Sequence, residues 1–197
     1  MAPTLKSSAR RPHRETILGI DPGSLVTGWG LVDYEGHQLC HQSHGIIGTS
    51  ASVSLAERLS QIYRGLHEII EHYHPTAVSI EKVFFSRNVQ SALKLGQARG
   101  VALLAAAEHQ IGVAEYSAAE IKVAVVGYGR ATKEQVQKMV SVLLCVRGAM
   151  RADAADALAA AICHIHRRAF QAPVIQPLNE RIAKTSWRDC LELAAKR

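Results

Sequence analysis

The stretch from Ile17 to Ser24 reads ILGIDPGS, and it sets the framework for the rest of the chain. Four mostly apolar residues precede Asp21, and the residues after it are turn formers. This pattern predicts a short buried strand that ends at a carboxylate and enters a tight turn. A second strand is expected from about 27 to 34, and after the turn at Glu35-Gly36 a third from 37 to 48. The chain therefore begins with a meander of three antiparallel strands.

Helices and strands alternate after this meander. Apolar residues recur from Leu55 to Ile69 at the spacing of one helix face, and Pro75 closes that segment. A short apolar strand, 77–80, then runs into Glu81. The remaining elements are expected as a helix over 88–109, a strand over 112–116, and helices over 118–126, 132–145 and 152–168. The order resembles the ribonuclease H-like architecture, an α/β fold with a mixed sheet of about five strands, three antiparallel strands first, flanked by helices.

Four carboxylates carry the chemistry of this plan. Asp21 and Glu81 each end a strand, and the carboxyl ends of neighbouring parallel strands meet at one edge of a sheet. Asp153 and Asp156 are three apart on an alanine-rich helix, so they share a face and repel one another unless a cation lies between them. Oxygen donors from separate elements suit Mg²⁺ or Mn²⁺. Because paired divalent ions serve in-line phosphodiester displacement, the acids predict a metal-dependent phosphodiester site.

Composition restricts the remaining possibilities. The 197 residues fit one domain with tails, and 48% apolar with 20% charged residues indicates a folded chain. Residues 17–81 carry two basic and seven acidic groups, whereas residues 82–151 carry ten basic and four acidic groups. This asymmetry is typical of a surface that binds a polyanion beside a site that binds cations. The longest apolar runs have seven residues, which is too short to span a membrane.

The two ends of the chain differ from its middle. Residues 1–15 are expected to form a flexible basic arm without the apolar segment of a secretory signal, and residues 169–197 a weakly structured tail. Residues 16–168 form the single domain between them. Four scattered cysteines favour a reducing, cytoplasmic setting and argue against a thiolate metal site. The histidines, His164 and His166 among them, are interpreted as scattered surface groups.

Several motifs together resemble the RuvC family of Holliday junction resolvases. They are ILGIDPGS at 17–24 with Thr27-Gly28, IEKVF at 80–84, SALKLGQARG at 91–100 and DAADAL at 153–158. The resemblance implies a homodimeric endodeoxyribonuclease that resolves four-way DNA junctions by paired symmetric nicks, in homologous recombination and DNA repair. It also implies Mg²⁺ as cofactor, two ions per active site with Mn²⁺ as a substitute, and the branch-migration proteins RuvA and RuvB as partners.

The resemblance also assigns roles by position. The residues that match the family's catalytic and metal-binding carboxylates are Asp21, Glu81, Asp153 and Asp156. Lys122 and Lys133 match its DNA-contacting lysines, and Phe84 matches the aromatic residue that stacks at the junction. Arg87, Lys94 and Arg99 are expected as further DNA contacts from their charge alone.

A symmetric pair of nicks needs two active sites, and one chain has one set of carboxylates, which predicts a two-fold dimer. The helix over 88–109 is the expected contributor to its interface. Gly96 and Gly100 lie four apart on that helix, so one stripe of it is expected to approach another element closely.

Two functions of other classes remain open at this point. The Asp-Pro-Gly-Ser turn with Thr27-Gly28 also resembles the first phosphate loop of the sugar kinase, Hsp70 and actin group, which binds ATP. That group uses two such lobes, and 197 residues supply one. A non-catalytic junction-binding protein that keeps the fold is the other alternative, and it would be expected to lack part of the carboxylate set.

Overall fold

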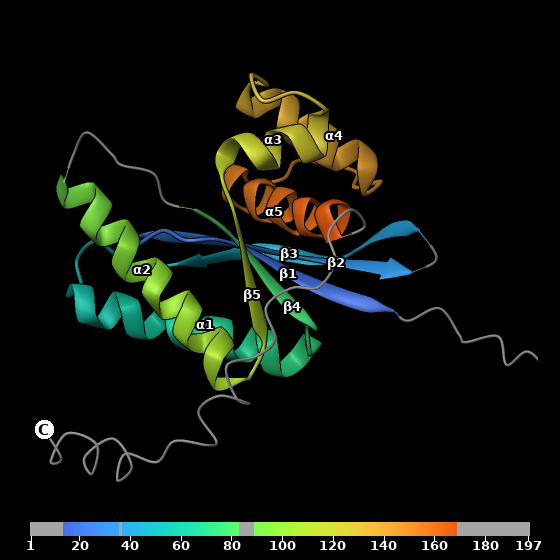
Figure 1. The fold of residues 1–197 in the computed structure, drawn as a ribbon. Coiled ribbons are helices and arrows are strands. Elements are labelled where there is room, and N and C mark those ends of the chain that lie inside the picture. The colour runs from blue at the N-terminus through green and yellow to red at the C-terminus, as the bar shows by residue number, and fades with distance from the viewer. Residues whose placement is uncertain (1–13, 36, 83–88, 169–197) are drawn as a thin grey trace, which may run out of the picture.

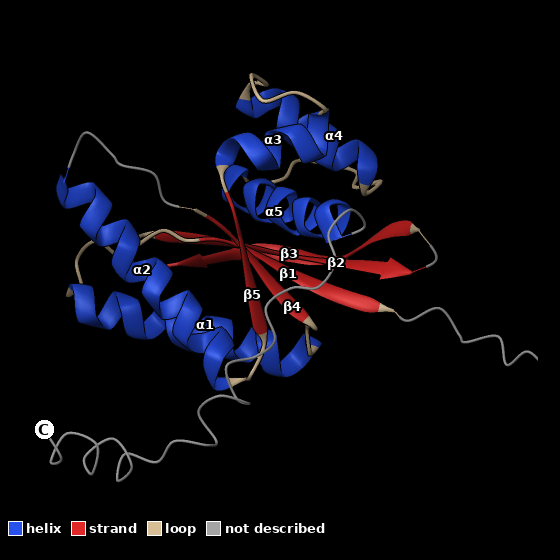
Figure 2. Cartoon of the chain, in the orientation of Figure 1, coloured by secondary structure: helices blue, strands red, loops and turns tan. Residues whose placement is uncertain are grey.

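The computed structural model describes residues 14–35, 37–82 and 89–168. Its five-stranded sheet has the order β3-β2-β1-β4-β5 (Figure 2). The strands are β1 (Glu15–Asp21), β2 (Val26–Glu35), β3 (Gln38–Gly48), β4 (Ala77–Glu81) and β5 (Gly112–Tyr116). The first three are antiparallel neighbours, whereas β4 runs parallel to β1, and β5 parallel to β4. The predicted α/β architecture with a mixed five-stranded sheet is confirmed.

Helices cover both faces of this sheet (Figure 1). One face carries α1 (Leu55–Tyr73) and α2 (Val89–Glu108), and the other carries α3 (Ala118–Val126), α4 (Lys133–Leu143) and α5 (Ala152–Arg168). Each helix layer has its own buried cluster, because β1 alternates its side chains across the sheet. Ile17 belongs to the cluster under α5, and Leu18 belongs to the cluster under α1 and α2. The central strands β1, β2 and β4 are therefore the buried part of the sheet.

Polar capping residues decide where three of the helices begin. Ser54, Ser117 and Thr132 each accept a hydrogen bond from the third residue of the helix that follows. In each case the side chain of that third residue, a Glu or a Gln, accepts a bond from the cap's own backbone N–H in return. Such reciprocal caps satisfy amide groups that the first turn leaves without partners. They fix the start of α4, which carries Lys133 as its first residue.

The central helix α5 lies unusually close to the sheet because glycines face it. A Cβ atom built on Gly28 of β2 would lie 2.0 Å from the carbonyl oxygen of Asp153, and one on Gly19 of β1 would lie 1.8 Å from that of Ala157. The alanines of α5 contribute the matching small surface, and Ser79 Oγ donates a 2.7 Å hydrogen bond to the Ala160 carbonyl. The height of α5 over the sheet is thus set by main-chain contact.

Replacing Gly28 by alanine is expected to destabilise the fold strongly. The new methyl group would overlap the backbone of α5, and overpacking of this kind costs about 1–3 kcal/mol or more. Gly112→Ala is the matched control, since a Cβ atom on that strand glycine meets nothing within 4 Å. Urea unfolding followed by circular dichroism would measure both. Equal midpoints for the two variants would contradict the contact.

The close approach predicted for Gly96 and Gly100 is not found within the described chain. A Cβ atom on either glycine would meet nothing within 4 Å, because α2 turns its alanines, including Ala98 and Ala102, towards the sheet. The glycines lie on the outer side, near the exposed Leu93. None of the helices in the described residues has the length and apolar character of a membrane span.

Candidate active site

The strand order brings two of the predicted carboxylates together. Ile20 of β1 pairs with Ile80 of β4 in the parallel ladder. The residue that follows is Asp21 on β1 and Glu81 on β4. Both acids therefore leave the same end of the two central strands. On its other side Asp21 is paired with Gly28, the residue that touches the α5 backbone. As the sequence predicts, strand pairing brings Asp21 and Glu81 to the same end of the sheet.

The N-terminal part of α5 adds the other two acids. Asp153 and Asp156 lie over this end of the sheet, and each is partly buried. Electrostatic repulsion reaches Asp21 from Asp156, Glu81 and Asp153 alike, so the four carboxylates form one cluster. Arg151 lies 3.8 Å from Asp153, at the outer rim. Three segments that are at least sixty residues apart in the sequence thus supply one acidic site.

A lysine from α4 stands within this cluster. Lys133 Nζ lies 2.5 Å from Asp156 Oδ2, and its charge also acts on Asp21, Glu81 and Asp153. Lys122 of α3 faces Glu81. A pocket of about 230 Å³ opens between these elements, lined by Glu81, Ala118, Ile121, Lys122, Lys133, Val136, Asp156 and Ala159. Both lysines that were predicted to contact DNA thus line the same pocket as two of the acids.

Burial and crowding make the ionised acids costly in the absence of a bound cation. Burial, followed by repulsion from Asp156 and Glu81, raises the pKa of Asp21 to about 7 against an ordinary 3.8. Burial and then Asp156 also raise the pKa of Glu81, while Lys133 and Lys122 oppose that rise. Burial raises the pKa of Asp156, and the Lys133 ammonium opposes it. Several hard oxygen donors whose negative charges are poorly compensated fit a divalent cation such as Mg²⁺.

The Asp21 carboxylate should therefore reduce the stability of the metal-free protein. The pKa of Asp21 is higher in the folded protein than in the unfolded chain, so folding favours the protonated carboxyl group. The stability that this protonated group contributes is complete below about pH 3.8, and it is lost as the pH rises through about 7 and the group ionises. Asp21→Asn is expected to unfold at a higher temperature than the wild type at pH 8 in chelator, by several degrees. The difference should shrink at pH 5.

Thermal melts at both pH values would measure this effect. Glu68→Gln is the control, because this glutamate is exposed and belongs to α1, which covers the face of the sheet opposite to α5. If Asp21→Asn melts at or below the wild-type temperature at pH 8, the repulsion is weaker than the burial of Asp21 indicates.

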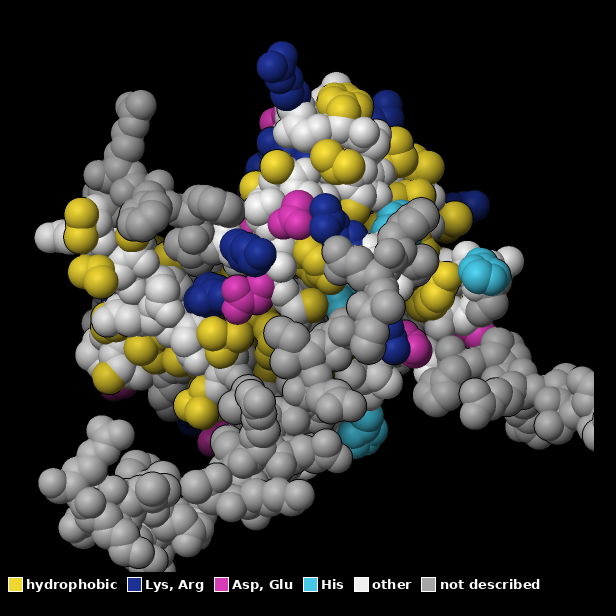
Figure 3. All heavy atoms as spheres, in the orientation of Figure 1, with side chains coloured by type: hydrophobic (Ala, Val, Ile, Leu, Met, Phe, Trp, Pro, Cys, Tyr) yellow, Lys and Arg dark blue, Asp and Glu magenta, His cyan; other side chains and the backbone are white. Residues whose placement is uncertain are grey.

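The other predicted DNA contacts are less closely grouped. Phe84 and Arg87 lie outside the described residues. Lys94 is exposed on α2, whereas Arg99 of the same helix forms an ion pair with Glu115 of β5. Figure 3 shows basic and acidic side chains next to one another on the face of the molecule that it presents. Arg167 of α5 also pairs with Glu120 of α3 at 2.9 Å. Arg99 thus has a carboxylate partner within the chain.

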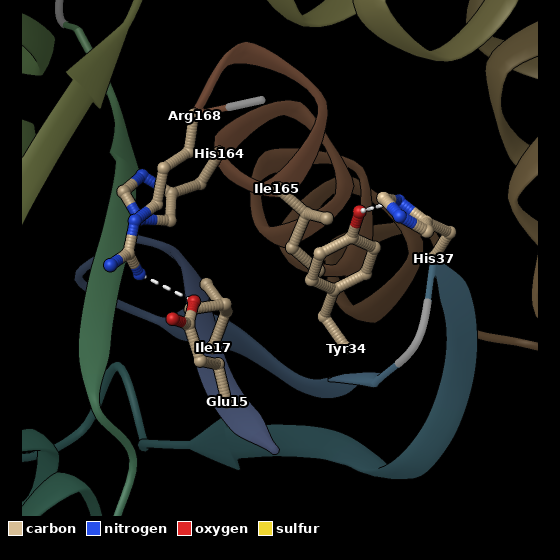
Figure 4. A pocket seen from close by; sticks show the side chains of 7 residues that line it. All are labelled: Glu15, Ile17, Tyr34, His37, His164, Ile165 and Arg168. Atoms are coloured by element: carbon tan, nitrogen blue, oxygen red, sulfur yellow. Dashed lines mark hydrogen bonds and ion pairs between the residues drawn. The ribbon is translucent and has the colours of Figure 1, made fainter. Parts of the chain in front are cut away.

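A larger pocket, of about 280 Å³, lies where β1 begins and holds none of the predicted site residues. Figure 4 shows Glu15 and Arg168 paired across it, with the Tyr34 hydroxyl 3.1 Å from His37 Nδ1. The prediction that His164 is a surface group is wrong. Its side chain is buried beside this pocket, where Nδ1 lies 3.0 Å from the Tyr116 hydroxyl, and burial lowers its pKa to about 4.

Comparison with known sequences gives one consistent family. The family model described as crossover junction endodeoxyribonuclease RuvC matches residues 17–164. A crossover junction endodeoxyribonuclease RuvC from Legionella pneumophila (strain Lens) is 55% identical over 152 residues, which cover 77% of this chain and 87% of the relative. Its counterpart from Syntrophotalea carbinolica is 54% identical over 150 residues, covering 76% and 93%.

Solved structures agree with these sequences. Thermus thermophilus RuvC in complex with a Holliday junction substrate superposes with a TM-score of 0.76 at 34% identity, covering 79% of this chain and 96% of that one. The same protein solved as "Thermus thermophilus RuvC structure" gives a TM-score of 0.73. The yeast mitochondrial Holliday junction resolvase Ydc2 shares the fold, with a TM-score of 0.58 at 12% identity over 82% of each chain.

Proposed function

The chain belongs to the RuvC family of crossover junction endodeoxyribonucleases, and from this premise we propose that Asp21, Glu81, Asp153 and Asp156 are the catalytic residues with which it resolves Holliday junctions. The observation that carries the proposal is the convergence of these acids at one end of β1 and β4. Family membership decides against the phosphate-loop ATP-binding alternative. A complete carboxylate set decides against the non-catalytic one.

The acids would hold divalent metal, and we assign Mg²⁺, two ions per site, with Mn²⁺ as a substitute. When bound, such ions activate the attacking water and neutralise charge on the leaving oxygen of the phosphodiester. The chain's own contribution is to hold four carboxylates on strand ends and on a helix in main-chain contact with the sheet, so the ligands would be positioned before DNA arrives. Lys133 and Lys122 lie close enough to these acids to bind the scissile phosphate there.

The remaining DNA contacts serve affinity and junction shape. Phe84, Arg87, Lys94 and Arg99 stay proposals, the first as a base-stacking residue and the others as backbone contacts. Among these, Lys94 is exposed, whereas Arg99 would have to exchange Glu115 for a phosphate. A basic surface of this kind binds DNA with strong salt dependence.

The decisive experiment compares a synthetic four-way junction with a linear duplex of matched sequence, with and without Mg²⁺. We expect paired symmetric nicks in the junction only, and only with the metal. Equal cutting of the duplex would indicate a general nuclease instead. Cleavage in chelator would show that the carboxylates do not act through metal.

We further propose that the active form is a homodimer that uses α2 at its interface. The outer side of this helix exposes the residues Val89, Leu93 and Leu104, which are 70%, 62% and 52% exposed, beside Gly96 and Gly100. These residues form one stripe at helical spacing, and a second copy of the chain would bury it. The branch-migration proteins RuvA and RuvB, and a cytoplasmic location, are proposed from the family alone.

Mixed dimers of wild-type and Asp21→Asn chains should test the dimer. On a supercoiled plasmid that extrudes a cruciform, the wild type is expected to give mainly linear product, because both strands are cut within one complex. The mixed dimer should give singly nicked circles. Linear product from the mixed dimer, or sedimentation of the junction complex with one chain, would contradict two-fold cooperation.

A further inference from the structure

Three metal-ligating side chains meet at the far end of the α1–α2 layer, away from the carboxylates. His67 and Glu71 lie four residues apart on one face of α1, and His109 directly follows α2. One nitrogen of each imidazole and one oxygen of Glu71 all lie within 4.8 Å of one another. Within the described ranges, no other group of three His, Cys, Asp or Glu residues brings such atoms so close together. The four proposed nuclease acids do not do so either.

The imidazole of His109 links the other two residues. Its Nε2 atom lies 2.9 Å from His67 Nδ1, and its Nδ1 atom lies 3.2 Å from Glu71 Oε1. With both rings neutral, His109 Nδ1–H donates to Glu71 and His67 Nδ1–H donates to His109 Nε2. Each ring would bind the ion through one nitrogen, and the ion would take the place of a proton there, since metal binding to histidine displaces protons.

The surroundings hold both rings in place. The Tyr63 ring stacks on His67 with centroids 6.0 Å apart, and the Tyr63 hydroxyl donates to the carboxylate of Glu108, the neighbour of His109. After His109 the chain turns through Gln110, whose φ of 58° is left-handed, and the Ile111 N–H donates to the Ala106 carbonyl at 2.9 Å. His109 is thus fixed at a closed helix end. Such supporting contacts orient ligands in metal sites.

The cluster is also open to solvent on one side. The His109 side chain is 16% exposed, whereas that of Glu71 is 59% exposed, so an ion could enter past the carboxylate. Two imidazoles and one carboxylate are a donor set of Zn²⁺, which leaves a fourth position for water. Mg²⁺, by contrast, prefers oxygen ligands. The chemistry of this cluster therefore differs from that of the four acids.

We propose that His67, Glu71 and His109 bind a Zn²⁺-class ion that clamps α1 to α2, at a site separate from the nuclease centre. The connections of the chain separate the two places. Helix α1 ends just before β4 begins, and His109 precedes the start of β5, whereas Glu81 stands at the end of β4. The clamp would hold the helix layer that covers one face of the sheet, and it does not depend on the proposed cleavage chemistry.

Equilibrium dialysis of the full chain against Zn²⁺ tests the site, with metal analysis and excess Mg²⁺ to occupy the carboxylates. At a Zn²⁺ concentration that fills the proposed site, we expect the wild type to bind one more ion than His67→Gln or His109→Gln. The affinity of this site for Zn²⁺ should be at least about 10-fold lower in each variant. His72→Gln is the matched control, an exposed histidine of the same helix outside the cluster. Zn²⁺ should also raise the melting temperature of the wild type and the control by several degrees, but not that of the variants.

Other results would overturn the proposal. It fails if the wild type binds no more Zn²⁺ than His67→Gln, or if His72→Gln loses as much binding as the cluster variants. Melting curves in chelator show whether each variant folds. Should a histidine variant melt early, Glu71→Gln decides, because its exposed side chain can be changed with little risk to folding, and unchanged Zn²⁺ affinity there would count against the site.

Discussion

Glu81→Gln is expected to abolish junction cleavage while leaving junction binding in metal-free buffer unchanged. Glu81 and Asp21 stand at the ends of paired strands, so neither can be replaced by another acid from the same element. Loss of one preorganised charged group costs on the order of 10²-fold or more in rate. Asp21→Asn and Asp156→Asn should behave alike, whereas Asp153→Asn should be milder, since its role is expected to concern mainly the second ion.

Single-turnover cleavage of a labelled junction at saturating enzyme would measure the rates, and gel shift in chelator would measure binding. Glu68→Gln is again the control, and it should cut at the wild-type rate. Near-wild-type rates in the first three variants would mean that the metal site has been misplaced. Lost binding in chelator would instead mean that the acids organise the DNA surface.

Lys133→Ala is expected to slow cleavage by at least about 10-fold. Binding of the junction should lose no more than about one contact to a DNA phosphate. The ammonium lies 2.5 Å from Asp156 and its charge acts on the other three acids, so we expect it both to balance charge in the site and to bind a phosphate of the DNA. The salt dependence of junction affinity should lose about one unit of slope. Lys122→Ala should show the same slope change with a smaller effect on rate, because its charge acts on Glu81, whereas Lys133 also forms the ion pair with Asp156.

Affinity titrations between about 50 and 200 mM salt would give the slopes, and the single-turnover assay would give the rates. Lys138→Ala serves as the matched control, since this exposed lysine lies on the same helix outside the pocket. Lys133→Arg keeps the charge and should restore the slope, but not the full rate, because a guanidinium cannot replace an ammonium at a short contact without rearrangement. A wild-type rate for Lys133→Ala would place this lysine outside the reaction.

Much of the fold could be predicted because its signals are local. The strand that ends at Asp21 and the one that ends at Glu81 are apolar runs followed by polar residues, and their meeting follows from parallel pairing. The spacing of Asp153 and Asp156 likewise follows from helix geometry. A carboxylate site at one edge of the sheet was therefore within reach of the sequence.

Features that depend on how elements pack could not be predicted. Gly96 and Gly100 have helical spacing, yet the glycines that admit α5 are Gly19 and Gly28 on the strands. Lys133 has no sequence feature that places it beside Asp156. His67 and His109 are forty-two residues apart, and only the packing of α1 against α2 brings their rings together. Pairs of this kind are tertiary contacts without a local signal.

The position of α5 has a consequence for the growing chain. This helix is the last described element, yet it covers the central strands β1, β2 and β4 and carries two of the four acids. A nascent chain that has not yet reached residue 152 lacks the helix that covers these central strands, and it lacks two of the four acids that we propose as metal ligands. If the proposed carboxylate set is the cleaving centre, nearly the entire domain is synthesised before that set is complete, and a partly synthesised chain is not expected to cleave DNA. Folding must wait for long-range contacts between the first strand and the final helix, which is typically slow.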